Sequence, residues 1–354
     1  MENLPPIDAW VASSMLQKAI RRDEANLASS AAAALYRMRG NAIWRRLIAI
    51  CFEDIGVANP ELCVTVTELG STPTSRRVRG DDAEVIDLLV RLMATSPKCR
   101  EADYLICGAI QAPFAENQRA LVAKKTVDER IELATDASAS MITRSIAAWM
   151  VGETNGGGQK VLSDGNLLGL MHRFVAQGVS PPFADATILA AKRTAEPITI
   201  MGPLLSLAMR QLGEGSVIIQ NTLPPAVDCG GIPSWVFDKH TATGKSAFRI
   251  LLQENRKIRD CIAAFVPEFR ALDLVAMSAF YADATPIRRQ LVWSQSSPLY
   301  SVGLKTDMTK IGCPDDGVET IVSVVIAHLD HLNNIRQRLR SSRSHGNRNA
   351  EVAL

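Results

Sequence analysis

Apolar residues recur along most of this chain at helical spacing, three or four positions apart, and short polar or proline-containing breaks separate the runs. The clearest run predicts a helix over residues 43–55, with one apolar face made by Ile43, Leu47, Ile50, Cys51 and Ile55. Similar patterns predict further helices over residues 13–22, 28–39, 59–69, 83–95 and 96–110. Short helices with brief connections are typical of an all-α bundle.

The second half of the chain also has apolar residues at helical spacing, with one exception. Helices are predicted over residues 127–134, 138–150, 166–177, 184–194, 204–212 and 317–340. Residues 213–244 instead form an irregular Gly/Pro-rich segment, with a short strand over residues 217–219. Gly156–Gly158 marks a flexible loop or a domain boundary.

The fold class that follows is mostly all-α. We expect an N-terminal extension (1–12), a first helical domain (13–150), a second helical domain with the irregular loop (160–340) and a basic polar tail (341–354).

One carboxylate interrupts the apolar face of the 43–55 helix. Asp54 falls between Ile43 and Cys51 on that face and in the last turn, where it opposes the helix dipole. A buried, unpaired carboxylate costs several kcal/mol, so Asp54 requires a cationic or N–H partner from another element. Arg45, Arg46 and Glu53 lie off the face, and the group predicts a structural ion pair or, alternatively, an assembly contact.

Several pieces of residues 13–105 resemble a known family. They are LQKAIRR (Leu16–Arg22), ALYRM (Ala34–Met38), WRRLIAICFEDIG (Trp44–Gly56), ANPEL (Ala58–Leu62) and VIDLLVRLMATSPKCREADYL (Val85–Leu105). This region is similar to the helical C-terminal region of the AAA+ ATPase family that includes replication-associated recombination protein A (RarA, also MgsA) and the Werner-helicase-interacting ATPase.

The resemblance implies a clamp-loader-collar-like helical bundle that assembles oligomers beside an ATPase at stalled replication forks. Only residues 1–12 precede the similar region, where the family carries its ATPase domain, so we expect no intrinsic ATPase activity. The segment Ser71–Asp82 departs from the family pattern because it is polar and basic.

Charge restricts the kind of nucleic-acid contact that is expected. The net charge is only +2, so any contact with nucleic acid must come from local patches. Candidate phosphate-binding residues are Arg76, Arg77, Arg79, Lys239, Lys245, Arg288 and Arg289. The last two precede Trp293 and Tyr300, and interleaved aromatic residues suit single-stranded nucleic acid.

The Asp238–Lys245 loop offers the strongest alternative chemistry. Gly244–Ser246 spells GKS before a helix expected from Ser246, but a P-loop needs a glycine where Lys239 stands. Lys239, Lys245 and the helix N-terminus could instead hold a phosphate. Asp238 and His240 are candidates for a catalytic dyad, although no nucleophile lies nearby.

Cysteine and histidine patterns indicate neither a metal nor a cofactor. The seven cysteines have no CxxC spacing, and Cys51 and Cys107 are predicted to be buried thiols, which suits the cytoplasm. On a continuous helix Asp330 lies opposite His328 and His331, so the HLDH sequence is not a convincing metal motif. No apolar run reaches the ~18–20 residues that a membrane helix needs, and no membrane contact is expected.

The leading hypothesis is a non-ATPase, DNA replication- or repair-associated assembly protein. It would form a homo-oligomer or dock on a replication or repair ATPase through its collar-like helices, and its basic segments would contact DNA phosphates. The alternatives are an enzyme that acts on a phosphorylated substrate through the Asp238–Lys245 loop, and a pure protein-interaction module.

Overall fold

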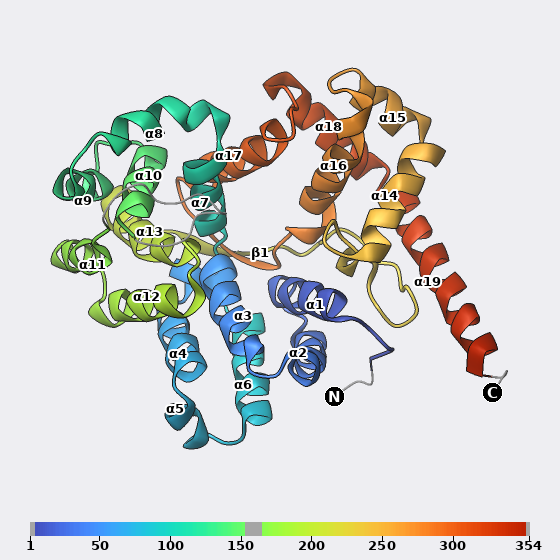
Figure 1. Cartoon of the computed structure of the whole chain (residues 1–354), viewed down its shortest axis with the longest axis horizontal. Coiled ribbons are helices and arrows are strands. Elements are labelled where there is room, and N and C mark those ends of the chain that lie inside the picture. The colour runs from blue at the N-terminus through green and yellow to red at the C-terminus, as the bar shows by residue number, and fades with distance from the viewer. Residues whose placement is uncertain (1–3, 153–164, 352–354) are drawn as a thin grey trace. The chain divides into compact units, whose positions relative to one another are not determined.

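The computed structural model describes residues 4–152 and 165–351 (Figure 1). Contacts divide the chain into two compact units. We call them the terminal unit (Met1–Met38, Asn221–Arg288, Met308–Leu354) and the central unit (Arg39–Gln220, Arg289–Asp307).

These units differ from the contiguous domains expected at 13–150 and 160–340. The physical reason is that the N-terminal helix packs against elements that follow residue 221, so both ends of the chain join one unit. Residues 13–105, where a collar-like bundle was expected, therefore lie partly in each unit. The boundary expected at Gly156–Gly158 lies outside the described residues.

Helices account for nearly all regular structure in the described parts of the chain, beside a single two-stranded sheet, so the all-α prediction is confirmed. None of the described helices is long and apolar enough to cross a membrane.

The central unit holds most of the helices. Its α-helices are α3 (Ala42–Ile50), α4 (Pro60–Ser71), α5 (Pro73–Arg77), α6 (Asp82–Thr95), α7 (Glu101–Gln111), α8 (Glu116–Ala123), α9 (Val127–Thr135), α10 (Met141–Val151), α11 (Leu167–Ala176), α12 (Pro181–Thr194), α13 (Ile198–Leu212) and the start of α17 (Ser296–Thr309). The shorter elements are a π-helix, η1 (Cys51–Ile55), two 3-10 turns, η2 (Gly56–Ala58) and η3 (Pro113–Ala115), and the strands β1 (Ser216–Ile219) and β2 (Arg289–Val292). Helix α10 packs against α7 and α9, and α12 packs against α4.

The terminal unit is built from segments distant in sequence. Its elements are α1 (Ala9–Arg21), α2 (Ala25–Arg39, which ends at the boundary), a 3-10 turn η4 (Ser234–Val236), α14 (Ala242–Glu254), α15 (Arg256–Ala263), α16 (Glu268–Ala279), a π-helix η5 (Phe280–Ala284), α18 (Asp315–Ala327) and α19 (Leu329–Glu351). Helix α14 packs against α16 and α19.

Several helix starts follow directly from local chemistry. Asn59 accepts a hydrogen bond from the backbone N–H of Leu62 (3.1 Å), and Pro60 occupies the first helical position of α4. Asp81 and Glu84 form a reciprocal capping box at the start of α6. Helix α1 begins before the expected Ser13, because Asp8 caps it through the N–H of Val11.

Three predicted helices have different bounds in the structure. The 43–55 helix changes at Cys51 into η1, and the 317–340 helix breaks at His328 into α18 and α19. Helix α7 starts at Glu101 rather than residue 96, because Lys98 pairs with β2: its N–H donates to Arg289 and its carbonyl accepts from Leu291 (both 2.9 Å). Tertiary pairing thus overrides the helical pattern there.

Candidate functional site

The Asp54 prediction leads to an ion cluster around Arg100 in the central unit. Asp54 is fully buried in η1, and its Oδ1 lies 3.2 Å from Nη1 of Arg100, which caps α7. Glu53 lies 3.6 Å from Nη2 of Arg100, and Asp103 contacts the same nitrogen. The Asp54 carbonyl also accepts from the N–H of Cys99 (2.9 Å). Asp54 therefore has both a cationic partner and a backbone contact on another element.

This cluster is a structural joint, by which we mean a buried ion cluster that holds two elements together. Burial by itself lowers the pKa of Arg100, but Asp103 and Asp54 outweigh it, so the pKa lies well above its ordinary value. The guanidinium stays charged and holds η1 against α7. The residues that were grouped with Asp54 in the sequence do not all join the Arg100 cluster. Arg45 instead donates to the Thr194 carbonyl at the end of α12 (2.7 Å). Arg46, with Glu53 and Asp103, lines a small cavity of about 220 Å³.

The terminal unit contains a second joint of the same kind, which the sequence reasoning missed. Asp283 sits in the π-helix η5 and is 1% exposed, and Nη1 of the fully buried Arg336 in α19 pairs with it. Arg22 donates to the Asp283 carbonyl (2.9 Å) and stacks over the Trp235 ring. The available signal was a carboxylate within an apolar run, the same signal that identified Asp54.

The proposed Asp238–His240 dyad is not assembled as a catalytic pair. Oδ2 of Asp238 pairs with the buried ammonium of Lys18 at 2.8 Å, and Oδ1 accepts from the backbone N–H of His240 at 2.9 Å. The His240 ring is exposed and packs edge-on against Phe280. Both carboxylate oxygens are therefore engaged in a link between α1 and the loop.

The GKS sequence lies inside a capped helix. Helix α14 begins at Ala242, four residues before the expected start, because the side chain of Thr241 accepts from the N–H of Gly244 (3.1 Å). The N–H of Lys245 already donates to the Thr241 carbonyl (3.0 Å). The cap engages the N–H of Gly244, one of the donors that a phosphate at this helix start would use. Gly244 is required for packing, since a Cβ there would lie 1.9 Å from the Asp238 carbonyl oxygen.

The candidate phosphate-binding residues fall into different environments. Arg76 is buried: it stacks over Trp44, pairs with Asp82 (2.9 Å) and donates to the Leu69 carbonyl (2.9 Å). This corrects its assignment as a phosphate contact, because an arginine with these partners is part of the core. Arg77 and Arg79, on the same short segment, are exposed.

The remaining candidates are partly engaged by the protein itself. The Lys239 ammonium lies over the Phe280 ring at 4.4 Å, and Arg288 donates to the Asn221 carbonyl at 2.9 Å. The neighbouring aromatic residue Trp293 is only 6% exposed, so its face is not open for stacking with a base. Lys245, by contrast, is exposed on α14.

Lys245 belongs to a set of exposed cations that the sequence reasoning did not group. We call this set the basic face: Lys245 and Arg249 on α14, Arg256, Lys257 and Arg259 on α15, and Arg338 on α19. The signals in the sequence were the four-residue spacing of Lys245 and Arg249, which places them on one side of α14, and the run RKIR at residues 256–259.

Contacts bring these elements together around the end of α14. Arg259 Nη1 donates to the carbonyls of Leu252 and Gln253 (3.4 and 3.3 Å). Arg338 Nη2 contacts both carboxylate oxygens of Glu254 (2.8 and 2.7 Å). Glu254 and Asp260 are the two carboxylates on α14 and α15, and they pair with Arg338 and with Arg256 (3.1 Å), so cations outnumber carboxylates on these two helices.

The histidines of the HLDH segment make structural contacts. His328 caps the end of α18 with its ring against the Val324 carbonyl (2.8 Å), and His331 contacts Glu254 (3.0 Å). The helix breaks at His328, so His328 and His331 do not lie on one continuous helix as expected. Within residues 4–152 and 165–351, no group of three or more His, Cys, Asp or Glu side chains has a metal-binding arrangement.

A cavity of about 680 Å³ opens in the terminal unit. Its polar lining is Asp23, Glu24, Asn26 and Asp228. Burial raises the pKa of Glu24, and Asp228 accepts from the N–H of Gly231 (2.8 Å). This acidic lining disfavours binding of a phosphate in the cavity, and none of its lining residues belongs to the Asp238–Lys245 loop.

Comparison with known proteins adds no relative: no family model, no curated protein and no solved structure matches this chain.

Proposed function

We propose that the protein is a non-ATPase, nucleic-acid-associated assembly protein whose basic face contacts phosphates. The observation that carries the proposal is the gathering of six exposed cations on three packed helices of one unit. Such a surface attracts a phosphate backbone without reading its sequence. The resemblance of residues 13–105 to the RarA family supports DNA replication or repair as the setting, with a replication or repair ATPase as a partner.

The proposal places the protein in the cytoplasm. All seven cysteines are free thiols, and Cys51, Cys63, Cys99, Cys229 and Cys313 are buried. Reducing conditions keep thiols in this state.

Helix α19, which carries Arg338, continues to Glu351. The segment expected as a basic polar tail thus continues the helix.

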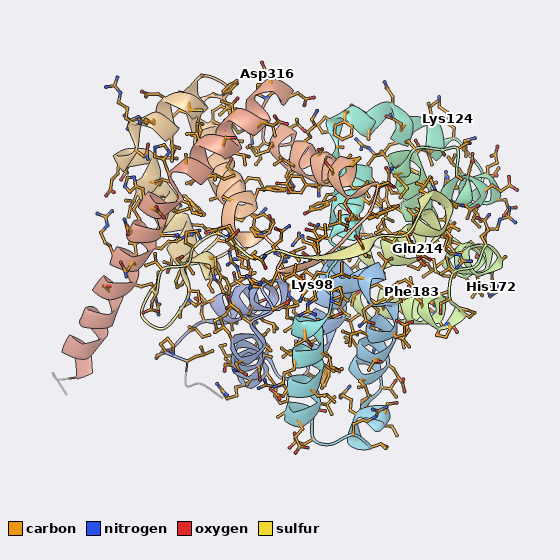
Figure 2. All side chains as sticks on the ribbon, turned by 180° about the vertical axis from the view of Figure 1, so that it is seen from behind. Lys98, Lys124, His172, Phe183, Glu214 and Asp316 are labelled. Carbon is orange, nitrogen blue, oxygen red and sulfur yellow. The ribbon has the colours of Figure 1, made fainter. Side chains whose placement is uncertain are left out.

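A matched pair of charge reversals tests the proposal. Fluorescence anisotropy with a labelled single-stranded oligonucleotide at several salt concentrations would compare K245E/R249E with K124E/K125E. Lys124 and Lys125 are exposed on the central unit, and Lys124 is labelled in Figure 2. Both variants change the net charge equally, so only contact with the basic face distinguishes them.

We expect K245E/R249E to weaken binding at least ~10-fold and to reduce the slope of log affinity against log salt by about 1.4, the loss of two phosphate contacts. The K124E/K125E control should retain the wild-type slope. Equal losses in the two variants, or a wild-type protein that binds neither single-stranded nor duplex DNA at low salt, would refute the proposal. Binding to duplex DNA alone would retain the basic face but change the nucleic-acid class.

A further inference from the structure

The outer edge of β1 is apolar, exposed and uncharged. Val217, Ile218 and Ile219 are 48%, 43% and 54% exposed, although β-branched side chains on a strand normally pack against neighbouring side chains of the protein. β1 pairs with β2 on one side, antiparallel, with Ile218 opposite Gln290 (Figure 1). The opposite side has no strand within the described residues.

The far side of β2 shows which backbone groups of β1 are unpaired. On the side of β2 away from β1, Lys98 (labelled in Figure 2) donates its N–H to the Arg289 carbonyl, and its own carbonyl accepts from the N–H of Leu291. Arg289 and Leu291 therefore direct their N–H and C=O groups away from β1. Alternate residues of a strand point to opposite edges, so Gln290 and Val292 face β1. Their partners in register are Ile218 and Ser216.

It follows that Val217 and Ile219 direct their N–H and C=O groups outward. Within the described part of the chain, neither residue makes a backbone hydrogen bond on this outer side. An edge with exposed donors and acceptors and with apolar side chains is a template for another strand.

The edge is complementary to itself. In an antiparallel pair with a two-fold axis at Ile218, Val217 of one copy faces Ile219 of the other, and these are the residues whose backbone groups point outward. Each such pair exchanges two hydrogen bonds, and Ile218 faces its own counterpart in a close, non-hydrogen-bonded pair. Every cross-strand pair then joins two β-branched side chains, which is favourable.

Charge favours a second copy over an unrelated peptide. Residues 215–222 (GSVIIQNT) contain no charged residue and no proline, the two devices that normally protect an edge strand. Self-pairing therefore brings no like charges together, and the neutral edge offers nothing to orient a charged peptide. We propose that two copies of this chain pair β1 with β1 to form a four-stranded sheet in the order β2–β1–β1–β2. This dimer concerns assembly and does not require nucleic acid.

The first test removes one outward donor. Val217→Pro deletes the N–H that points away from β2 and leaves the β1–β2 bonds of Ser216 and Ile218 in place. Val217→Thr keeps the N–H and the side-chain shape as a control. Light scattering across a concentration series should show the wild type and the threonine variant approaching twice the 38.4 kDa chain mass, and the proline variant at the single mass.

A charge swap at the axis separates self-pairing from other associations. Ile218→Lys and Ile218→Glu each place two like charges opposite each other, so each alone should be monomeric. Mixed together, the two variants should form a heterodimer, because each lysine then faces a glutamate. Circular dichroism checks that all variants keep the wild-type fold, and a nuclease-treated sample excludes bridging by nucleic acid.

A wild-type protein that stays monomeric at every concentration would overturn the inference. So would a dimer that survives both Val217→Pro and Ile218→Lys, because the interface would then lie elsewhere. Either result leaves the basic-face experiment unaffected, so failure of this inference is distinguishable from failure of the proposed function.

Discussion

Replacing one member of the Lys18–Asp238 pair should destabilise the terminal unit far more than replacing both. The two side chains are 3% and 4% exposed and 2.8 Å apart, and the Lys18 ammonium also donates to Ser14 (2.7 Å) and the Val236 carbonyl (3.3 Å). Burial lowers the pKa of Lys18 to about 8, although Asp238 opposes the shift. Burial raises the pKa of Asp238, but Lys18 outweighs it, so the carboxyl pKa lies below its usual value. At neutral pH both groups are therefore charged.

The magnitudes follow from this balance. Breaking a buried pair costs about 3–5 kcal/mol when the remaining charge stays buried. In Asp238→Asn, Lys18 escapes part of that cost by losing its proton, because its pKa already lies near 8, so we expect a loss of about 2–4 kcal/mol. Lys18→Met leaves the Asp238 carboxylate with the His240 N–H and should cost about 3 kcal/mol or more.

The double variant K18M/D238N should cost only about 0–1 kcal/mol, because neither charge is then left buried without its partner. Urea unfolding, followed by circular dichroism at pH 7, measures the free energy of unfolding of the wild type, the two single variants and the double variant. The loss in the double variant minus the sum of the two single losses is the coupling energy of the pair. Additive losses, with a double variant as unstable as the sum of the singles, would refute the reasoning.

The same pair predicts a pH dependence with a definite sign. Between pH 8 and 10.5 the unfolded chain keeps the Lys18 proton that the folded chain has lost, so the free energy of unfolding rises with pH, by about 3 kcal/mol in total. Buried thiols act oppositely: burial raises the pKa of Cys229 and Cys313 to about 11, so their contribution falls as pH rises from 9 to 11. The difference between wild type and Lys18→Met cancels the thiols. A difference that is flat above pH 8 would contradict the assignment.

Three further experiments test the packing arguments through thermal or urea unfolding. Gly244→Ala should destabilise by at least about 2 kcal/mol despite the better helix propensity of alanine, because the new Cβ meets the Asp238 carbonyl; a stabilised variant would show that α14 can shift. Arg100→Met should cost about 3–5 kcal/mol by leaving three carboxylates without their cation, and an unchanged midpoint would mean that the cluster is not a joint. Arg76→Gln should destabilise by about 2–4 kcal/mol while Arg77→Gln stays within about 0.5, and equal effects would contradict the burial of Arg76.

Sequence patterns were sufficient where the determining interactions are local. Apolar periodicity predicted the helical class and placed the starts of α4 and α6, at residues 59 and 83, within one residue of those observed, where Asn59 and Asp81 cap the helices. The sequence also predicted that Asp54 has a cationic or N–H partner, because a buried, unpaired carboxylate costs several kcal/mol in any fold. The identity of that partner, Arg100, did not come from the sequence, since it lies 46 residues away.

Only the tertiary structure decided which charged residues are available to a ligand. Arg76 and Arg77 are adjacent and chemically alike, yet one stacks on Trp44 and the other is exposed, because a side chain's environment depends on long-range packing. The same holds for Asp238, whose partner Lys18 lies 220 residues earlier in the chain, and for the interleaved units found in place of contiguous domains. Local pattern determines which elements form, whereas pairing between distant segments, which a linear pattern does not encode, determines which surfaces remain exposed.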